Sequence, residues 1–264
     1  MHPYGIIHTM KEHISYSEMK MWAECPRKHK LVYLDKISLF KGNEFTAFGQ
    51  AVHSTCENLL LNENLDKEKH FMESFLEQTN QLQKEDLDND LIESMKEQGR
   101  NISKFVLPAV KSYFGDYEVL STEEMLYVPI DGYDDIYFKG YIDLVLKDKN
   151  GKIHIVDWKT CSWGWDSSKK TNKLINYQLT LYKYFYAKKH NIEKLKDIEV
   201  HFALLKRTAK KNNVEIFRST SGDRRIKNSL KLLNNALYNI KKKVSIPNRL
   251  SCQYCEFYKT EHCK

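Results

Sequence analysis

The sequence predicts a mixed α/β fold in which an N-terminal helical segment precedes a strand-rich core. Up to residue 116, apolar residues recur mainly at the three- and four-residue spacings of amphipathic helices. From Tyr117 they follow strand patterns, and the turn sequences 133–135 and 149–151 separate consecutive strands. Helical periodicity then returns. A chain of 264 residues is long enough for one well-buried core and short for two, so we expect one domain over residues 1–264.

Local signals justify each element in order. A capping box at 15–18 begins a helix that ends near Cys25, because Pro26 suits the first turn of the next helix. Periodicity predicts further helices over 27–34, 46–61, two within 67–113, 172–190 and 224–243, and strands over 117–130, 136–147, 152–160, 199–206 and 214–218. The chain therefore divides into a mainly helical segment (1–116), a strand-rich core (117–220) and a last helix with a cysteine-rich tail (221–264).

The charge balance favours a polyanionic partner. Basic residues number 42 against 35 acidic ones, a formal net charge of +7, although lysines that only solubilise the surface would give the same excess. No run of about 18 apolar residues is present, so we expect no transmembrane helix. Residues 1–12 lack the apolar centre of a signal peptide, which predicts a cytoplasmic protein, or one in the host cytoplasm if it is phage-encoded.

Two aspartates and a lysine lie on the first predicted hairpin of the core. Asp157 and Lys159 are two residues apart and share a face of their strand. Whether Asp143 on the preceding strand joins them depends on the loop. A two-residue loop would turn Asp157 to the other face, whereas the three-residue loop 149–151 pairs Asp143 with Asp157. We predict the odd-length loop, or an equivalent bulge, with Gly151 in the left-handed position.

This grouping suits phosphodiester hydrolysis. Two carboxylates can hold Mg²⁺ or Mn²⁺, which polarises a phosphoryl oxygen and helps to generate hydroxide. Lys159 would stabilise the developing negative charge or orient the attacking water. The alternative is an ordinary surface ladder of salt bridges. Apolar residues flank Asp143 on both sides, which predicts a buried strand, and a buried charge needs a partner or a metal.

Further motifs carry a resemblance to a known family. In chain order they are Ser15-Tyr16-Ser17, Cys25-Pro26-Arg27, Gly49-x-x-x-His53, Gly140-Tyr141-Ile142-Asp143, Asp157-Trp158-Lys159-Thr160 and Gln178-x-x-x-Tyr182. This ordered set resembles the RecB-like branch of PD-(D/E)XK nucleases over nearly the whole chain. The resemblance implies a restriction-endonuclease-like core, a central mixed sheet flanked by helices. Two mild departures are an Asp as the second acid and the lack of proline before Asp143.

The resemblance also implies roles for single residues. His53, Asp143 and Asp157 would bind the metal, with the backbone carbonyl of Trp158 as a further ligand. Lys159 would be the catalytic lysine. Gln178 and Tyr182 would position the lysine or the nucleic acid, and Glu124 would be a further acidic participant, with Glu123 as the rival choice.

The cysteine-rich tail indicates a second metal centre. Cys252-x-x-Cys255 and Cys263 need a fourth ligand, and the resemblance implies Cys25 and a [4Fe–4S] cluster, as in the CRISPR-associated and AddB-like members. Zinc is the alternative, with His29 or His262 able to replace one thiolate. Unliganded cysteines remain a further reading. Either metal centre would clamp the C-terminal tail to the N-terminal helices. Cys56 and Cys161 are expected to be packing residues.

The expected function is that of a freestanding nuclease, because the chain contains no GxxxxGK[ST] motif of an ATP motor. Trp163 and Trp165, followed by Lys169 and Lys170, suit stacking on single-stranded DNA, although packing of a loop would use them equally well. We expect an exonuclease on single-stranded DNA ends, with 5′ to 3′ polarity suggested by the resemblance, in recombination, repair or phage DNA metabolism. The alternatives are a non-catalytic DNA-binding adaptor, and an endonuclease that trims CRISPR spacer precursors with partner proteins. The expected partners besides DNA are a second copy of the chain, or recombination or CRISPR proteins.

Overall fold

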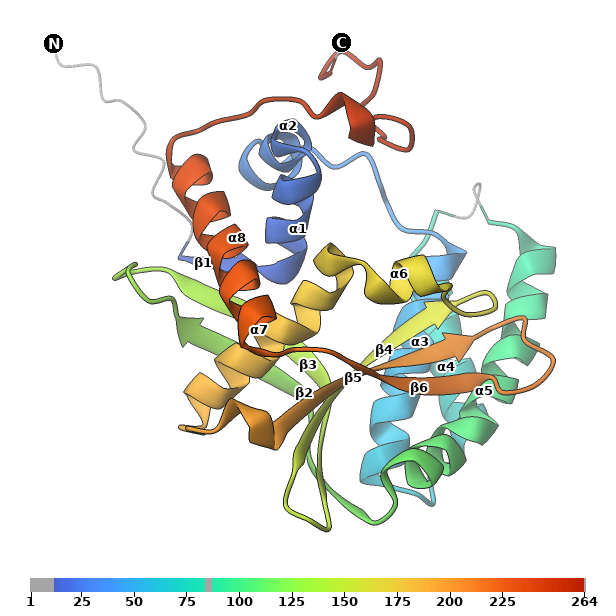
Figure 1. Cartoon of the computed structure of the whole chain (residues 1–264). Coiled ribbons are helices and arrows are strands. Elements are labelled where there is room, and N and C mark those ends of the chain that lie inside the picture. Colours follow the sequence, from blue (N-terminus) through green and yellow to red (C-terminus); the bar gives the residue numbers. More distant parts are fainter. Residues whose placement is uncertain (1–11, 84–86, 264) are drawn as a thin grey trace, which may run out of the picture.

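The computed structural model describes residues 12–83 and 87–263, and its centre is a six-stranded mixed sheet (Figure 1). The strands are β1 (His13–Ser15), β2 (Tyr117–Pro129), β3 (Tyr137–Asp148), β4 (Ile153–Cys161), β5 (Ile198–Lys206) and β6 (Val214–Ser219). β4 pairs with β5, and β1 with β3, in parallel, whereas the β2–β3, β3–β4 and β5–β6 pairs are antiparallel. Because β2 follows β3 along its length, β1 and β4 share the other edge of β3, β1 beside 137–139 and β4 beside 144–147.

Helices cover both faces of this sheet. One face packs against α1 (Tyr16–Glu24), α7 (Lys173–Lys189) and α8 (Asp223–Lys241), and the other against α3 (Glu44–Leu61), α4 (Lys67–Asn80) and α5 (Asn89–Phe114). Short elements complete the chain: α2 (Pro26–His29), η1 (Lys30–Leu34), α6 (Ser167–Thr171), η3 (Leu195–Asp197) and η4 (Arg249–Ser251). Each face has its own buried apolar cluster. The expected fold, a central mixed sheet flanked by helices, is confirmed.

The hairpin between β3 and β4 has the predicted three-residue loop. Lys147 pairs with Ile153, and the N–H of Asp148 donates to the carbonyl of Lys152 at 2.9 Å. Gly151 has a φ of 80°, the left-handed conformation that glycine adopts without strain. This prediction is therefore confirmed, and it fixes the register that brings Asp143 opposite Asp157.

Other local predictions agree with the structure except for a few short elements, which include the 3-10 turns η3 and η4. Ser15 caps α1, its Oγ accepting the N–H of Glu18 at 3.2 Å. Pro26 begins α2. The sequence did not predict β1 or α6, which span three and five residues and are too short to show a periodic pattern.

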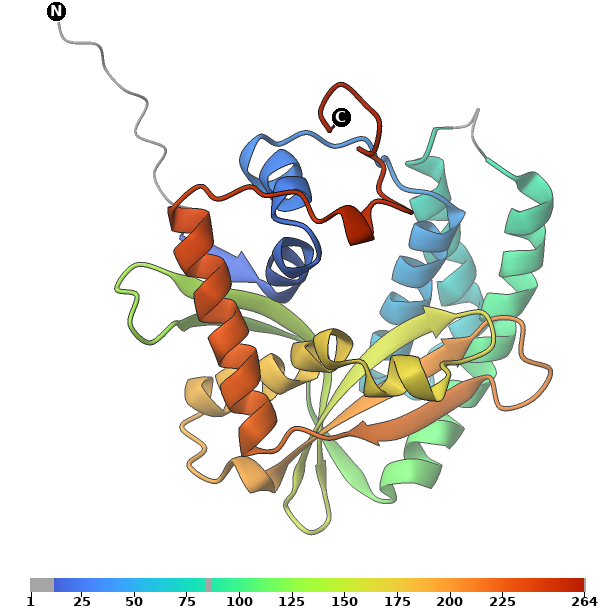
Figure 2. The ribbon, with the colours of Figure 1, turned by 45° about the horizontal axis from the view of Figure 1, so that its top comes forward.

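The C-terminal tail returns to the N-terminal helices. After α8 the chain crosses over α1 and α2, as Figure 1 and Figure 2 both show. Ser251 Oγ donates to the carbonyl of Glu24 at 2.8 Å, and Arg27 donates to the carbonyl of His262 at 3.0 Å. Lys28 forms a 2.8 Å ion pair with Glu256. Polar contacts therefore hold the C-terminal tail on α1 and α2.

In the part of the chain that the structure describes, no helix combines the length and the apolar character needed to cross a membrane. The expectation that residues 1–12 are not a signal peptide concerns a segment that lies almost entirely outside the described residues.

Candidate active site

The candidate site begins where β3 and β4 separate. Their pairing ends at Leu144 and Val156. Beyond this point the side chain of Asp143 replaces the missing backbone partner, because its Oδ2 accepts the N–H of Trp158 at 2.7 Å. Continuing the register places Asp143 opposite Asp157. The separation of the strands thus opens a gap in the sheet, and a carboxylate lies in it.

The gap gives the site access to both helix layers. Ile142 and Leu144 are two residues apart, yet they pack in different apolar clusters, so the alternation of β3 breaks at Asp143. On the α3 side, His53 Nδ1 lies 3.8 Å from Asp143 Oδ2. On the α7 side, Gln178 donates from Nε2 to Asp157 Oδ1 at 2.8 Å.

Lys159 neutralises the two carboxylates only in part. Its Nζ lies 2.6 Å from Asp157 Oδ2. Burial raises the pKa of Asp143 and of Asp157 to about 6, and the positive charge of Lys159 limits this rise. Burial acts to lower the pKa of Lys159, but the charges of Asp157 and Asp143 outweigh it and raise that pKa. Two buried acids whose pKa values are raised beside a lysine form a site that attracts a further cation.

The donor set fits a divalent metal ion. Asp157 Oδ2 is buried and, among the described residues, accepts no hydrogen bond of good geometry in spite of its ion pair with Lys159. Burial, and then the charge of Lys159, lower the pKa of His53 to about 4, so its imidazole is neutral at pH 7 and available as a ligand. The N–H bond to Asp143 brings the peptide of Trp158 beside the carboxylates. His53, Asp143 and Asp157 could therefore hold the ion, with the carbonyl of Trp158 nearby.

Glu124 does not join this group and needs a correction. It pairs with Ile142 on the α7 face of the sheet, and its Oε1 contacts Lys189 and, at 3.0 Å, His190. These contacts hold the carboxylate of Glu124 away from the gap. Burial acts to raise the pKa of Glu124, but the hydrogen bonds from Lys189 and His190 outweigh it and lower that pKa. Glu123, the rival choice, lies between the pairs that β2 makes with Leu144 and Ile142, so it faces Asp143 across the two strands.

Glu57 is an acidic neighbour that the sequence analysis missed. Burial raises its pKa, and the charge of Glu123 and a hydrogen bond to the Glu123 side chain raise it further. The charge of Asp143 acts in the same direction. The signal was present in the sequence, since Glu57 follows His53 by one helical turn and shares its face of α3. A second pair of carboxyl groups thus lies beside the first.

The spacing of Gln178 and Tyr182 has a direct structural reason. They lie one turn apart on α7, and the Nε2 of Gln178 lies 3.4 Å from the hydroxyl of Tyr182. The ring of Tyr182 in turn packs against Gly140, where an added Cβ would lie 2.8 Å from ring atom Cε1. Glycine at 140 therefore lets Tyr182 approach the sheet, so that Gln178 can orient Asp157.

A cavity of about 430 Å³ lies beside Lys159 and Gln178. Its walls come from α1, α6 and α7, and the lining residues are Tyr16, Ser17, Lys20, Met21, Glu24, Lys159, Trp165, Lys169, Ile175 and Gln178. Three lysines face this cavity against one glutamate. The cavity thus offers positive charge and an aromatic wall next to the paired carboxylates.

The two tryptophans of the β4–α6 segment differ in environment. Trp163 is 76% exposed. Trp165 instead packs against Phe202 and Phe217, whose ring centroids lie 5.0 and 6.1 Å from that of Trp165. Lys169 Nζ lies 5.0 Å from the ring centroid of Trp165. Of the two, Trp163 is the one free to stack on a ligand, whereas Trp165 mainly serves the core.

Three of the predicted cysteine ligands, Cys25, Cys255 and Cys263, lie close enough to Cys252 to affect its pKa, but no three of the four described sulfur atoms lie within 4.8 Å of one another. Burial raises the pKa of Cys252, and the nearby thiols of Cys263, Cys255 and Cys25 raise it further. Cys25 Sγ also accepts the N–H of Asn248 at 3.3 Å. None of the described cysteines forms a disulfide. Cys56 is fully buried in the α3-side cluster, as a packing residue would be.

The paired carboxylates, the lysine and the divided mixed sheet define a class of protein: nucleases with a restriction-endonuclease-like fold, which cleave phosphodiester bonds. The PD-(D/E)XK nuclease superfamily matches the chain over residues 13–260. This match spans nearly the whole chain, and the protein therefore belongs to the PD-(D/E)XK nuclease superfamily.

One solved structure agrees at the level of the fold. The crystal structure of a proposed exonuclease from Eubacterium rectale superposes with a TM-score of 0.59 at 13% identity, covering 97% of this chain and 92% of that one. A second crystal structure, of the protein named SSO0001, gives a TM-score of 0.43 at 13% identity, over 94% of this chain and 85% of that one. A search of curated proteins finds no significant match.

Proposed function

We propose that the protein is a divalent-metal-dependent deoxyribonuclease that degrades single-stranded DNA from its ends. The observation that carries this proposal is the arrangement at the gap between β3 and β4, where Asp143 and Asp157 lie beside Lys159 and His53. A Mg²⁺ or Mn²⁺ ion bound there would polarise the scissile phosphate and lower the pKa of a water molecule.

The residues of the chain contribute the rest of the chemistry. Lys159 carries a positive charge at neutral pH, and it can orient the attacking water or balance the charge that develops on the phosphoryl oxygens. Gln178 holds Asp157 through its 2.8 Å bond, and Tyr182 supports Gln178 from the next turn of α7. Glu57 and Glu123 add two carboxyl groups beside this site. Burial raises the pKa of Glu57, and a bound cation would favour its charged form.

Single-stranded DNA suits the cavity beside Lys159. Lys20 and Lys169 provide charge for phosphates, and the exposed ring of Trp163 lies in the segment that leads from β4 to this cavity. Exonuclease action is supported by the proposed activity of the Eubacterium rectale protein and by the motif resemblance to the RecB-like branch, from which 5′ to 3′ polarity is also taken. The net charge of +7 favours DNA as the partner.

The decisive experiment compares wild type with Lys159→Ala on end-labelled single-stranded DNA with Mg²⁺ or Mn²⁺. We expect Lys159→Ala to lower the cleavage rate by at least about 100-fold, because one charged group at the reacting centre is worth roughly 3 kcal/mol. Lys188→Ala is a matched control. Lys188 lies in the last turn of α7, away from Gln178, and pairs with Asp131. DNA that is equally stable with wild type and Lys159→Ala would instead favour a non-catalytic DNA-binding adaptor.

Closed circular single-stranded DNA separates the two cleavage modes. An exonuclease degrades the linear strand and leaves the circle intact. Cleavage of the circle at a comparable rate would refute action from ends and favour an endonuclease, such as one that trims CRISPR spacer precursors with partner proteins.

We further propose that Cys25, Cys252, Cys255 and Cys263 hold a [4Fe–4S] cluster, with zinc as the alternative. The support is the effect of the other three thiols on the pKa of Cys252 and the polar contacts that hold the tail on α1 and α2. Such a centre would stabilise the fold because its binding is coupled to folding.

Anaerobic purification with iron, sulfide and zinc analysis tests the proposed cluster. We expect about four iron and four sulfide per chain, the composition of the cluster, and a loss of both, with a lower melting temperature, in Cys255→Ser. Cys161→Ser is the matched control, since Cys161 lies at the end of β4, outside the tail. Colourless protein with one equivalent of zinc would refute the iron assignment.

A further inference from the structure

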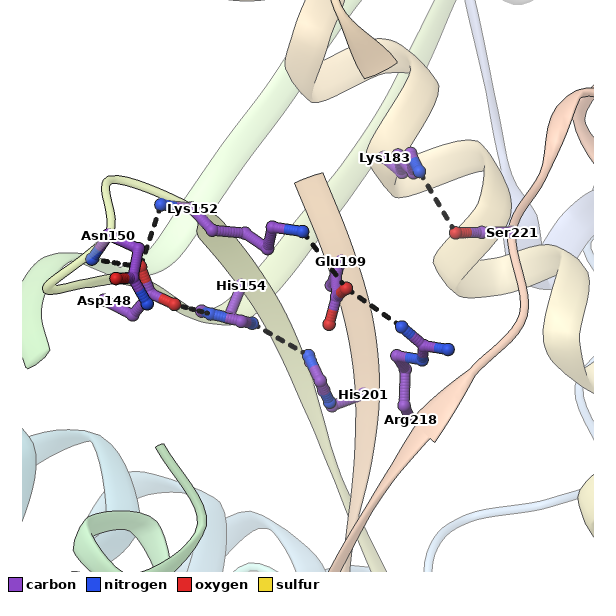
Figure 3. Close-up of polar contacts among 9 residues, drawn as sticks. All are labelled: Asp148, Asn150, Lys152, His154, Lys183, Glu199, His201, Arg218 and Ser221. Atoms are coloured by element: carbon purple, nitrogen blue, oxygen red, sulfur yellow. Dashed lines mark hydrogen bonds and ion pairs between the residues drawn. The ribbon is translucent and has the colours of Figure 1, made fainter. Parts of the chain in front are cut away.

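A second group of metal-binding side chains lies on the opposite face of the sheet from Asp157. His154 and Glu199 are register partners in the parallel pair β4–β5, and Val156 is the partner of His201. Residues two apart on a strand share a face, so His154, Glu199 and His201 all lie on the side of Val156. Val156 belongs to the α3-side cluster, whereas Asp157 faces α7. One ligand atom from each of the three residues lies within 4.8 Å of the other two (Figure 3).

Asp148 orients one of the two imidazoles. Its Oδ2 lies 3.3 Å from His154 Nε2, and its Oδ1 accepts the backbone N–H groups of Asn150 and Lys152, which fix the carboxylate in the hairpin loop. A carboxylate beside Nε2 keeps the proton on that nitrogen, so His154 Nδ1 presents a lone pair. It points at His201 Nε2, 3.0 Å away. Carboxylate support of this kind is typical of histidines that bind a metal.

His201 is also suited to bind a cation. It is only 2% exposed, and its Nδ1 has no hydrogen-bond partner among the described residues. Burial, and then the neighbouring His154, lower its pKa to about 3, so the imidazole stays neutral. Phe114 and Tyr113 at the end of α5 cover the pair, with ring centroids 5.1 and 5.5 Å from that of His201. The neutral imidazole of His201 and the ring of His154 therefore face each other in a site shielded from water.

Glu199 completes the donor set. Arg218 at 2.9 Å and Lys152 at 3.4 Å both contact its Oε1, whereas Oε2 has no hydrogen bond or ion pair in the described part of the chain. Figure 3 shows the carboxylate between these two cations and the histidine pair. The free oxygen can bind an ion while the cations hold the other oxygen. The same cations repel a metal, so they set its affinity below that of an uncompensated site.

We propose that His154 Nδ1, His201 Nε2 and a carboxylate oxygen of Glu199 form a second cation site, separate from the nuclease centre, for a divalent ion of the zinc class. Two nitrogen donors and one oxygen donor favour Zn²⁺ over Mg²⁺, which prefers oxygen ligands. An ion held there would join the first residues of β4 and β5 beneath the end of α5. Its role would be structural, since the site lies across the sheet from Lys159.

The test is a Co²⁺ titration of the full chain in excess Mg²⁺, which fills the carboxylate-rich nuclease centre. We expect wild type to bind one more equivalent of Co²⁺ than His201→Gln, with visible absorption and without the near-ultraviolet band of thiolate ligands. This spectrum distinguishes the site from the cysteine centre. Equal numbers of Co²⁺ ions in wild type and His201→Gln would overturn the proposal, and the two histidines would then be only a buried hydrogen-bonded pair.

Substitutions of the third ligand, Glu199, and of the exposed neighbour Arg218 keep the test valid if His201→Gln does not fold. Glu199→Gln should weaken Co²⁺ binding at this site at least tenfold, because it removes the only charged ligand. Arg218→Gln should tighten binding several-fold, because it removes a positive charge next to the site. Affinities unchanged in both variants would contradict the proposed ligand set. Because the readout is metal binding alone, failure of the nuclease proposal would leave this result unaffected.

Discussion

Replacing Asp157 by asparagine removes a negative charge from the centre of the candidate active site and leaves the size of the side chain nearly unchanged. The side chain is 2% exposed, and burial raises its pKa from the ordinary 3.8 to about 6 in the folded, metal-free protein. An acid whose pKa is raised by folding destabilises the folded state once it must ionise. The difference in pKa, at about 1.4 kcal/mol for each pH unit, corresponds to about 3 kcal/mol.

The direction of the pH dependence follows from the same values. Near pH 3.5 the carboxyl is mostly protonated in both the folded and the unfolded chain, so it has little effect on stability. The wild type then loses stability relative to Asp157→Asn as the pH rises from about 4 to about 6, and the difference is constant above that. Asparagine can accept from Lys159 if the amide of Gln178 turns and offers its oxygen to the new Nδ2. We therefore expect Asp157→Asn to stabilise the metal-free protein by about 1–3 kcal/mol at pH 7.5 while it abolishes nuclease activity.

Urea denaturation in EDTA, followed by circular dichroism at pH 3.5, 5 and 7.5, measures this difference. Glu124→Gln is the control of opposite sign, because contacts with Lys189 and His190 lower the pKa of Glu124 against the effect of its burial. Loss of the Glu124 charge in Glu124→Gln should destabilise the protein slightly at neutral pH. An Asp157→Asn protein that is no more stable than wild type at pH 7.5, or a difference that does not change with pH, would refute the assigned burial and charge of Asp157.

Two further substitution pairs test the surroundings of the site. Gly140→Ala should lower activity at least tenfold and destabilise the fold by about 1–3 kcal/mol, because its Cβ would lie 2.8 Å from the ring of Tyr182. Gly49→Ala, whose Cβ would meet its nearest atom at 3.5 Å inside α3, should lower neither activity nor stability. Equal losses of melting temperature and cleavage in the two variants would contradict this packing. Trp163→Ala should weaken binding of single-stranded DNA by about 1–3 kcal/mol in a polarisation assay without changing the melting temperature, because the ring is 76% exposed. Trp165→Ala should instead destabilise the fold by about 3 kcal/mol, and a reversed pattern would show that the roles of the two rings are exchanged.

The parts of the site that were predictable depend on local sequence. The loop between β3 and β4 determines whether Asp143 and Asp157 face each other. The sequence allowed a loop of two or of three residues, and the three-residue loop was predicted because it pairs the two aspartates. The one-turn spacing from Gln178 to Tyr182 likewise fixed their common face on α7. Such features need no knowledge of distant residues.

The choice between Glu123 and Glu124 could not be made from sequence. Glu123 has a φ of 49°, a left-handed conformation that is rare for a residue with a side chain, and the alternation of the facing strand breaks at the same level. A simple count of alternate residues along β2 therefore does not tell which glutamate faces the gap. β1 was missed for a related reason, because its three residues are ordered by pairing with β3 more than 120 residues away.

The histidines of β4 and β5 illustrate the same limit. His154 and His201 lie 47 residues apart, and only the parallel register of β4 with β5 brings their rings together. Neither residue belongs to a recognisable motif. Their proximity to Glu199 becomes visible only once the sheet order is known.

The bond from Asp143 to the backbone of Trp158 has a practical consequence for mutagenesis. The carboxylate closes the hydrogen-bond ladder where the two strands part, so it is a component of the sheet as well as a candidate metal ligand. Alanine at 143 would strip the N–H of its acceptor and could unfold the hairpin, and the resulting inactivity would say nothing about chemistry. Asparagine retains one acceptor oxygen for that N–H while removing the charge. A loss of cleavage in Asp143→Asn, with the sheet intact, is therefore the interpretable result at this position.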